Sequence, residues 1–600
     1  MDMYGFYTGK EFEAYKTQGA HLENGGVRFC TFAPAAYRVA VIGDFNGWQE
    51  WNMNPTNDGN FYEIFIPEAK EGQMYKYRIY TGNDSYTDHC DPYGFGMELR
   101  PANASIIRNM NSYHFQDEAW MNNRKTDYTK PVNIYEMHAG SWRNNSENEN
   151  GWYTYEVLAE KLVPYLKENG YNYVEFLPLT EHPCDESWGY QNTGFFAPTA
   201  RYGTAEQLKK MVDYFHQNGI GVIMDFVPVH FAIDSYALAK YDGTCLYEYP
   251  SNDVGVSEWG SHNFMHSRGE VRSFLQSSAN FWLAEFHFDG IRMDAISNII
   301  YWLGDPARGV NGNAVDFIRT MNAGLKERHP GCLLMAEDST NYAGVTKSAY
   351  EGGLGFDYKW DMGWMNDTLS YFQTSPEYRS KDYHKLTFSM MYYYDERFLL
   401  PLSHDEVVHG KATILQKMNG DYENKFPQAR AFYMYMYAHP GKKLNFMGNE
   451  LGQLREWDEK REQDWDILQY PVHDGFHRFM KRLNTLYLEH PALYKGDFEK
   501  EGFQWLDCSQ EEKVIYVMER RAVHSPEKLV AVFNFSDKMW KDYSFPVEDV
   551  DKLELLLSSE EECYGGIGAF KQSTLKVENG KVTLDVPPMC GLYFQGILSH

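Results

Sequence analysis

The stretch Phe286-His287-Phe288-Asp289-Gly290-Ile291-Arg292-Met293-Asp294-Ala295 decides how the rest of the chain is interpreted. Its aromatic and apolar residues predict a buried strand. Arg292 and Asp294 are two positions apart, so their side chains leave the same face of that strand. A cation beside a carboxylate keeps the carboxylate ionised. Taken alone, the stretch fits either a nucleophilic aspartate at the mouth of a parallel strand or a structural ion pair.

Strands alternate with helices on both sides of this stretch, from about residue 130 to residue 490, a pattern that predicts a parallel sheet. Helices are expected near residues 154–168, 204–218 and 270–285. Eight strand–helix units in about 360 residues predict an α/β fold, the (β/α)8 TIM barrel, with an excursion at about 231–269 after the third strand. The eight strands are expected at residues 133–138, 173–178, 221–227, 286–295, 332–337, 355–358, 398–404 and 444–448.

Both flanks of the barrel show short strands separated by turn signals. Asn46-Gly47 and Asp58-Gly59 are such signals near the N-terminus, and their spacing predicts a β-sandwich. Trp48 lies in one of these turns and is expected either to contact carbohydrate or to fill the sandwich core. The strand-and-turn pattern returns after about residue 500, which predicts a second, C-terminal all-β sandwich. The expected domains are residues 1–115, 116–495 and 496–600.

Composition excludes several classes of partner. The formal charge is −28, from 56 basic and 84 acidic residues. Such a surface repels phosphate backbones and anionic membranes, so we expect no nucleic-acid partner and no membrane partner. Aromatic residues make up 16% of the chain. Because aromatic rings pack well on the apolar C–H faces of sugars, this content gives mild support to a carbohydrate ligand.

The cysteines and the N-terminus indicate a cytoplasmic protein. Eight cysteines are widely spaced without a C-x-x-C pair, a distribution that excludes the familiar zinc patterns and makes a disulfide framework unexpected. The first residues have neither a basic region nor an apolar core of a signal peptide. No apolar run of about 18 residues is long enough to span a bilayer.

Polar residues collect at the carboxyl ends of the predicted strands, where barrel chemistry takes place. Glycosidic chemistry needs one carboxylate to attack C1 of the sugar and another to protonate the leaving oxygen. Glu337 follows an apolar run, a setting expected to keep it protonated as an acid. The candidates are Asp225 and His230 after the third strand, Arg292 and Asp294 at the fourth, Glu337 at the fifth, and His404 and Asp405 at the seventh.

Four segments in the right order resemble the catalytic segments of the α-amylase superfamily: residues 225–230, 290–295, 335–338 and 402–406. Within that superfamily the chain is most similar to the 1,4-α-glucan (glycogen) branching enzymes. The similarity covers nearly the whole chain, and the segment 43–51 resembles the small carbohydrate-binding module that precedes such barrels. The stretches that favour branching enzymes are residues 135–142, 181–183, 187–191, 352–360, 403–411 and 438–443.

The resemblance implies a role for each matched residue. It makes Asp294 the nucleophile, Glu337 the general acid/base and Asp405 the third carboxylate, which holds the sugar hydroxyls. The remaining matched residues would bind substrate or support the site. Tyr190 would stack under the sugar, His230 and His404 would hydrogen-bond its hydroxyls, Arg292 would orient Asp294, and Asp225 would support the site.

The implied activity is a retaining transfer of an α-1,4 glucan segment to a 6-hydroxyl, which creates an α-1,6 branch. The alternatives are an amylase or debranching hydrolase of the same superfamily and a non-catalytic glucan-binding scaffold. The expected partner is an α-glucan that serves as substrate and acceptor, without cofactor or metal, and the chain is expected to be a monomer or weak oligomer. The run Ser297–Asp305 departs from the usual branching-enzyme pattern and leaves acceptor binding open, as do Phe226, Met293 and Asp338.

Overall fold

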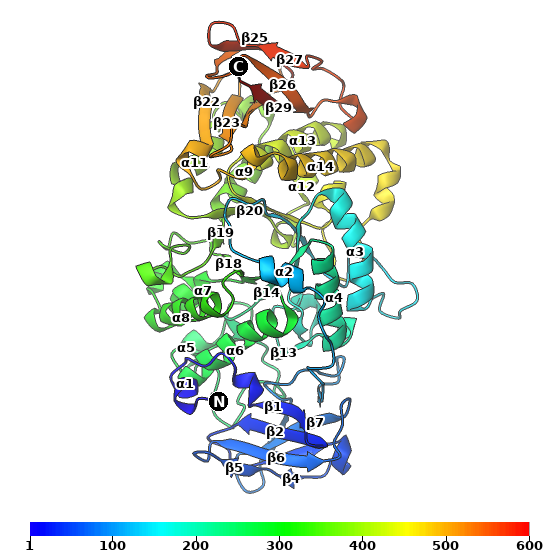
Figure 1. The fold of residues 1–600 in the computed structure, drawn as a ribbon, viewed down its shortest axis with the longest axis vertical. Helices are drawn as coiled ribbons and strands as arrows, with labels where there is room; N and C mark the ends of the chain where they lie inside the picture. The colour runs from blue at the N-terminus through cyan, green and yellow to red at the C-terminus, as the bar shows by residue number, and fades with distance from the viewer. Residues whose placement is uncertain (599–600) are drawn as a thin grey trace. The chain divides into compact units, whose positions relative to one another are not determined.

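A computed structural model describes residues 1–598 (Figure 1). Its N-terminal part forms two antiparallel sheets. The first has the order β1-β2-β6-β5, and the second has the order β4-β3-β7-β8, with β9 also paired to β7. The strands are β1 (Gly19–Glu23), β2 (Gly26–Phe32), β3 (Arg38–Gly43), β4 (Trp51–Asn52), β5 (Asn54–Thr56), β6 (Phe61–Pro67), β7 (Met74–Tyr80), β8 (Tyr86–His89) and β9 (Ser105–Ile106).

Alternation along β7 shows why these residues form a sandwich. Tyr75, Tyr77 and Ile79 are fully buried, because every second side chain of a strand faces the same side. Trp48 does not join this core: it is 38% exposed, and Trp51 is 42% exposed. The alternative that placed Trp48 in the sandwich core is therefore wrong. Gly47, with φ of 64°, turns the chain so that the indole of Trp48 lies outside.

The central strands close into a parallel barrel in chain order, as the alternating pattern predicts. The pairs β10–β21, β14–β17, β17–β18, β19–β20 and β20–β21 are parallel. The eight strands are β10 (Asn133–Met137), β11 (Tyr173–Phe176), β14 (Gly221–Phe226), β17 (Gly290–Met293), β18 (Leu333–Ala336), β19 (Tyr358–Trp360), β20 (Phe398–Leu402) and β21 (Lys442–Phe446).

Several predicted strands have other bounds in the structure; the eighth, for example, covers Lys442–Phe446 instead of 444–448. The fourth begins only at Gly290, because Phe286 is the last residue of helix α6 (Gly269–Phe286) and His287 ends that helix in the left-handed region, with φ of 62°. The sixth lies at Tyr358–Trp360 instead of 355–358, after a turn at Gly355 with φ of 82°. Asp294 consequently follows the end of its strand directly.

Helices cover the barrel strands. The residues that begin and end these helices can be recognised in the local sequence. Thr204 and Gln207 form a capping box at the start of α4 (Ala205–Gln217). Gly170 and Gly219, both with positive φ, follow α3 and α4 as predicted. In Figure 1, α6 and α8 (Gly312–Arg328) are both drawn in green, and they pack against each other. Further long helices are α3 (Tyr155–Asn169), α9 (Met362–Gln373), α13 (Tyr422–Ala438) and α14 (Pro471–Glu489).

The excursion after β14 contains little regular structure. Strands β15 (His230–Phe231) and β16 (His262–Asn263) pair in antiparallel fashion, and between them lies the short helix α5 (Asn252–Gly255). The excursion therefore begins at His230, one of the predicted site residues, and ends where helix α6 begins.

The C-terminal part is all-β, as predicted. A six-stranded sheet has the order β22-β23-β24-β29-β26-β27, and β25 pairs with β28. Its core includes Ile515, Val532, Phe545 and Leu592, all fully buried. The strands are β22 (Phe503–Gln510), β23 (Ile515–Arg521), β24 (Lys528–Asn534), β25 (Trp540–Pro546), β26 (Lys552–Ser558), β27 (Thr574–Lys576), β28 (Lys581–Val586) and β29 (Cys590–Ile597).

The chain divides into two compact units. The first comprises residues 1–126, 138–163 and 175–357, and the second comprises residues 127–137, 164–174 and those from 358 onward. Within residues 1–598, no helix has the length and apolar character required to cross a membrane.

Candidate active site

In the first unit, three neighbouring strands deliver the predicted carboxylates to one edge. Asp225 of β14 and Arg292 of β17 are direct cross-strand partners. The backbone hydrogen bonds between these parallel strands continue beyond the strand ends. The Asp294 amide donates to Phe226 O at 3.0 Å, and the Glu337 amide donates to Met293 O at 3.1 Å. Asp294 and Glu337 therefore both follow the carboxyl ends of adjacent strands, where the active sites of such barrels lie.

Arg292 connects the carboxylates of this unit. Its Nη1 lies 2.7 Å from Asp225 Oδ2 and 3.0 Å from Asp294 Oδ1, and its Nη2 lies 3.2 Å from Glu337 Oε2. Burial by itself would lower the pKa of Arg292, but the three carboxylates outweigh burial and raise that pKa well above its ordinary value. Arg292 is therefore a permanent cation at the centre of the site.

Glu337 has donors on one of its two oxygens. Arg292 Nη2 and the Ala295 amide, at 2.8 Å, both donate to Oε2. Ala295 adopts φ of 48°, a conformation uncommon for residues other than glycine, and this directs its N–H toward the carboxylate. The apolar run before Glu337 is buried as expected, but the carboxylate itself contacts a guanidinium and a backbone amide.

Tyr190 approaches the same ion pair from the loop after β12 (Thr180–Glu181). Its hydroxyl donates to Asp225 Oδ2, and Arg292 Nη1 donates to that hydroxyl at 3.2 Å. A sharp turn precedes it: Gly189 has φ of 92°, and a Cβ there would come within 2.5 Å of Pro178 O. Only glycine fits that turn without displacement.

His230 is positioned by Tyr190 and by the excursion. Its Nε2 lies 2.9 Å from Tyr190 O, and its Nδ1 lies 2.5 Å from Ser261 Oγ. Burial lowers the pKa of His230 to about 4, although the backbone contact with Tyr190 opposes the shift. The imidazole is therefore neutral at pH 7. The ring of Trp259 packs edge-on against it, with centroids 5.3 Å apart.

In the second unit, His404 and Asp405 follow β20 and are joined by Glu136 of β10. His404 Nδ1 lies 2.9 Å from Glu136 Oε2, and its Nε2 lies 3.3 Å from Asp405 Oδ1. The His404 amide also donates to Glu136 Oε1 at 2.9 Å. Burial alone would lower the pKa of His404, but Asp405 and Glu136 together raise it well above its ordinary value. His404 is therefore an imidazolium.

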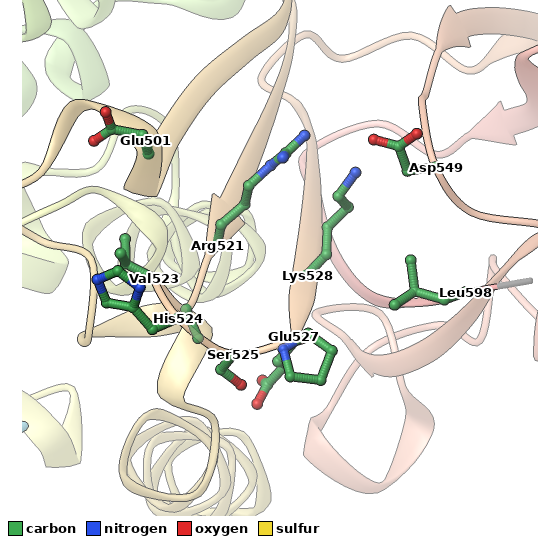
Figure 2. A pocket seen from close by; sticks show the side chains of 11 residues that line it. Glu501, Arg521, Val523, His524, Ser525, Glu527, Lys528, Asp549 and Leu598 are labelled. Carbon is green, nitrogen blue, oxygen red and sulfur yellow. The ribbon is translucent and has the colours of Figure 1, made fainter.

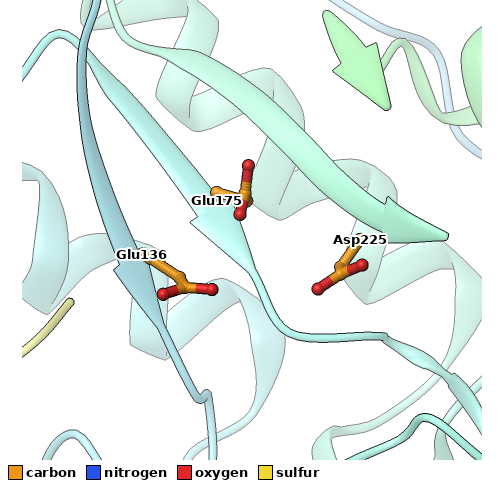
Figure 3. Close-up of side chains that lie close together, drawn as sticks. All are labelled: Glu136, Glu175 and Asp225. Carbon is orange, nitrogen blue, oxygen red and sulfur yellow. The ribbon is translucent and has the colours of Figure 1, made fainter. Parts of the chain in front are cut away.

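Glu136 is a site residue that the sequence reasoning did not select. It is fully buried in β10, most of whose other residues are apolar, and a carboxylate in such a strand is a signal that could have found it. Glu175 of β11 carries the same signal. Figure 3 shows Glu136, Glu175 and Asp225, each on its own strand, and the carboxylate oxygens of Glu175 and Asp225 lie within 4.8 Å of each other. Glu136, Glu175 and Asp225 are all buried side chains of barrel strands.

A separate pocket of about 330 Å³ occurs in the C-terminal part (Figure 2). Arg521, Lys528 and His524 line it together with Glu501, Glu527 and Asp549. Its described lining has no tyrosine or tryptophan on which a sugar could stack, and it holds two cationic and three acidic side chains. The pocket therefore does not have the features expected of the glucan site.

The structure thus brings together most of the predicted residues within each unit. In the first unit, Arg292 contacts Asp225, Asp294, Glu337 and Tyr190, and His230 contacts the Tyr190 backbone. In the second unit, His404 contacts Asp405, with Glu136 as an additional partner. The residues of the first unit can supply a nucleophile and an acid/base, and those of the second can supply a carboxylate and a cationic donor.

Comparison with known proteins identifies the domains of the chain. Family models match residues 17–94 as carbohydrate-binding module 48 (isoamylase N-terminal domain), 141–243 as the alpha amylase catalytic domain, and 505–596 as the alpha amylase C-terminal all-beta domain. A solved structure from Salmonella typhimurium, assigned as a candidate alpha amylase, covers 97% of the chain and 99% of its own length, with a TM-score of 0.73 and 16% identity. This likeness shows the fold.

Two relatives share far more of the sequence. The 1,4-alpha-glucan branching enzyme GlgB of Geobacillus stearothermophilus is 41% identical, over 98% of this chain and 94% of its own. The protein of the same name from Fusobacterium nucleatum is 44% identical, over 94% of this chain and 92% of its own.

Proposed function

The chain belongs to the 1,4-α-glucan branching enzymes of the α-amylase superfamily, and we propose that Asp294 and Glu337 carry out its reaction in two displacements. One observation supports this most directly: the two carboxylates follow adjacent strand ends, and one buried guanidinium contacts both. A retaining glycosidic transfer needs such a pair, one acting as nucleophile and the other as acid and then base.

In the first displacement, Asp294 attacks C1 of an α-1,4-linked glucosyl unit. The bond from C1 to the glycosidic oxygen breaks, and Glu337 gives its proton to the departing 4-oxygen, so a glucosyl ester of Asp294 forms. Both protein donors reach Glu337 Oε2, which leaves Oε1 for the proton that is transferred. Arg292 holds Asp294 ionised and in place for the attack.

In the second displacement, a 6-hydroxyl of another glucan attacks C1 of the ester. Glu337, now ionised, takes the hydroxyl proton, the bond from C1 to Asp294 breaks, and an α-1,6 branch results. The contacts of Arg292 and Ala295 with Glu337 Oε2 hold the carboxylate in place for this step. Glu337 is thus protonated at the start of the first displacement, where it acts as the acid, and ionised at the start of the second, where it acts as the base.

Asp405 and His404 are proposed to hold the hydroxyls of the same sugar. His404 remains an imidazolium whose Nδ1–H is directed at Glu136, so its Nε2–H, shared with Asp405, is the donor proposed for a sugar hydroxyl, and the Asp405 side chain is 47% exposed and can accept. Contacts that strengthen as the ring distorts lower the barrier to an oxocarbenium-like transition state. Tyr190 and His230 are proposed to contact the sugar from the first unit.

Carbohydrate-binding module 48 at residues 17–94 supports a long α-glucan as substrate and glycogen as product. A cytoplasmic location is proposed because the cysteines are widely spaced. All eight are free thiols in the structure, which suits a reducing compartment.

The test of branching is direct. Purified protein is incubated with amylose, and reducing ends are counted before and after treatment with a debranching enzyme. Few new ends before debranching and many after it are the expected result. Many ends before debranching and no further rise would mean hydrolysis, and the transfer assignment would fall while the assignment of the catalytic residues stood.

A further inference from the structure

A short hairpin follows the nucleophile and presents a tryptophan. After α7 (Ser297–Ile300), Tyr301 and Val310 form an isolated β-bridge, and the Trp302 amide donates to Gly309 O at 3.2 Å. Asn311 closes the hairpin by donating its amide to Ile300 O at 2.8 Å. Trp302 is therefore held on a closed, hydrogen-bonded turn, and its side chain is only half-buried.

Two tyrosines from other segments contact the rings of this hairpin. The ring of Tyr249, from the excursion, lies 5.9 Å from the ring of Trp302, and Asn311 Nδ2 donates to the Tyr249 hydroxyl at 3.2 Å. On the other side, Tyr301 and Tyr342 meet edge to face with centroids 6.2 Å apart. All four rings are half-buried, whereas rings of the barrel core, such as Phe288, are fully buried.

The two loops that carry the catalytic carboxylates also carry Tyr301, Trp302 and Tyr342, whereas Tyr249 comes from the excursion. Trp302 lies eight residues after Asp294, and Tyr342 lies five residues after Glu337. The loops are joined where they start, because the Ile296 amide donates to Glu337 O at 3.0 Å. Tyr342 is positioned by the turn after Glu337, in which the Thr340 amide donates to Asp338 Oδ1 at 2.9 Å.

We propose that Tyr249, Tyr301, Trp302 and Tyr342, the aromatic wall, bind the acceptor glucan during the second displacement. This inference rests on the proposed function. Half-exposed rings held in fixed positions suit the flat apolar faces of successive glucosyl units. Tyr342 links the wall to the acceptor because it lies on the loop of the acid/base: the leaving oxygen and the incoming 6-hydroxyl occupy the same place beside Glu337 in turn.

The wall also gives a function to one of the segments expected to depart from the usual branching-enzyme pattern. Trp302 lies within Ser297–Asp305, which the sequence analysis marked as divergent. A wall built from this chain's own residues would give it an acceptor preference of its own, while the catalytic carboxylates remain those of the superfamily.

The experiment separates the two displacements. Maltoheptaosyl fluoride forms the glucosyl ester and releases fluoride without an acceptor, so fluoride release reports the first displacement. Increasing concentrations of a linear maltooligosaccharide acceptor then divide the ester between transfer and hydrolysis. The Trp302→Ala variant is expected to keep fluoride release within about twofold and to need about tenfold more acceptor for half-maximal transfer.

Three further variants make the result specific. Trp302→Phe keeps a flat ring and is expected to restore most acceptor binding, whereas Trp302→Leu keeps apolar volume without the ring and is expected to share the defect of the alanine variant. Tyr350→Ala removes an 88% exposed ring of the same unit outside the wall and is expected to change neither measurement. Thermal unfolding of each variant verifies that the barrel is folded.

The outcomes distinguish this inference from the proposed function. Half-maximal transfer at the parental acceptor concentration in both Trp302→Ala and Trp302→Leu would overturn the wall alone. Loss of fluoride release in step with transfer would also overturn it, because the wall would then serve the donor. A parent enzyme that forms only hydrolysis products would overturn the branching assignment itself, and the acceptor wall with it.

Discussion

Arg292 Nη1 lies 2.7 Å from Asp225 Oδ2, and both side chains are completely buried. The same guanidinium reaches Asp294 and Glu337, so the supporting ion pair and the reacting carboxylates form one network. Breaking a buried pair by removing one partner leaves an uncompensated charge, which costs more than the pair itself contributes.

Replacing Asp225 by asparagine is therefore expected to affect both stability and catalysis. The variant should lose about 3 kcal/mol of unfolding free energy and fall about a hundredfold or more in kcat, because Arg292 would shift toward Asp294 and Glu337. Urea unfolding and branching kinetics measure the two effects. Asp316→Asn, which removes the 58% exposed partner of Arg272, is the control and should cost less than about 1 kcal/mol.

The roles of Asp294 and Glu337 can be separated by the leaving group. Asp294→Asn should abolish activity on amylose and on a glucosyl fluoride, since no ester can form, while its unfolding midpoint stays near that of the parent. Glu337→Gln should lose about 10²- to 10⁴-fold on amylose but recover fluoride release, because fluoride departs without a proton. Full activity of Asp294→Asn on amylose would contradict the assignment.

The Glu136–His404–Asp405 cluster should determine stability at alkaline pH. The pKa of His404 is raised, so its contribution is fully present below the unfolded-state value of about 6.5 and is lost as pH rises through the folded-state value. Glu136→Gln removes one of the two anions, lowers that pKa, and should move the loss of stability to lower pH. The unfolding free energy measured across pH 6 to about 10 tests this.

A matched control exists for this prediction. Glu511 pairs with His384 at 2.9 Å on the surface of the same unit, with side chains 46% and 62% exposed. Solvent screens such a pair, so Glu511→Gln should leave the pH profile unchanged. Equal shifts in both variants would show that the effect of Glu136→Gln is a general change of charge.

A buried histidine should stabilise the first unit at neutral pH. His216 lies 2.7 Å from both Asp117 Oδ2 and Asp289 Oδ2, and although burial opposes the charge, the two carboxylates raise its pKa to about 9. Its contribution, about 3 kcal/mol, is complete below pH 6.5 and is lost as pH rises through 9. His216→Gln should flatten this slope in unfolding measurements.

His266, in the same unit, changes the stability with pH in the opposite direction. Burial lowers its pKa to about 4, with only partial compensation by its contact with Pro228 O. The unfolded chain therefore binds a proton first, and this histidine reduces stability as pH falls below about 6.5. His266→Gln should flatten the acidic side of the profile and leave the alkaline side alone, the reverse of His216→Gln.

Local pattern predicted the barrel but not every boundary within it. Phe286, His287 and Phe288 are aromatic, and such residues suit a buried strand or a buried helix end equally well, so periodicity could not decide between them. Tertiary packing determines the boundary between helix and strand: Phe286 is the last residue of α6, and β17 begins at Gly290. The sequence likewise could not show that Trp48 lies outside the sandwich, because turn chemistry leaves the direction of its indole open.

The sequence by itself determined the order of strands and helices, and with it the place of Asp294 and Glu337, because parallel strands end at a common edge wherever they lie in the chain. Only the tertiary structure decided the partners. Glu136 precedes His404 by 268 residues, and His216 is 99 residues from Asp117 and 73 from Asp289. The protonation of a buried group depends on charges within a few ångströms, and folding alone brings such distant residues that close.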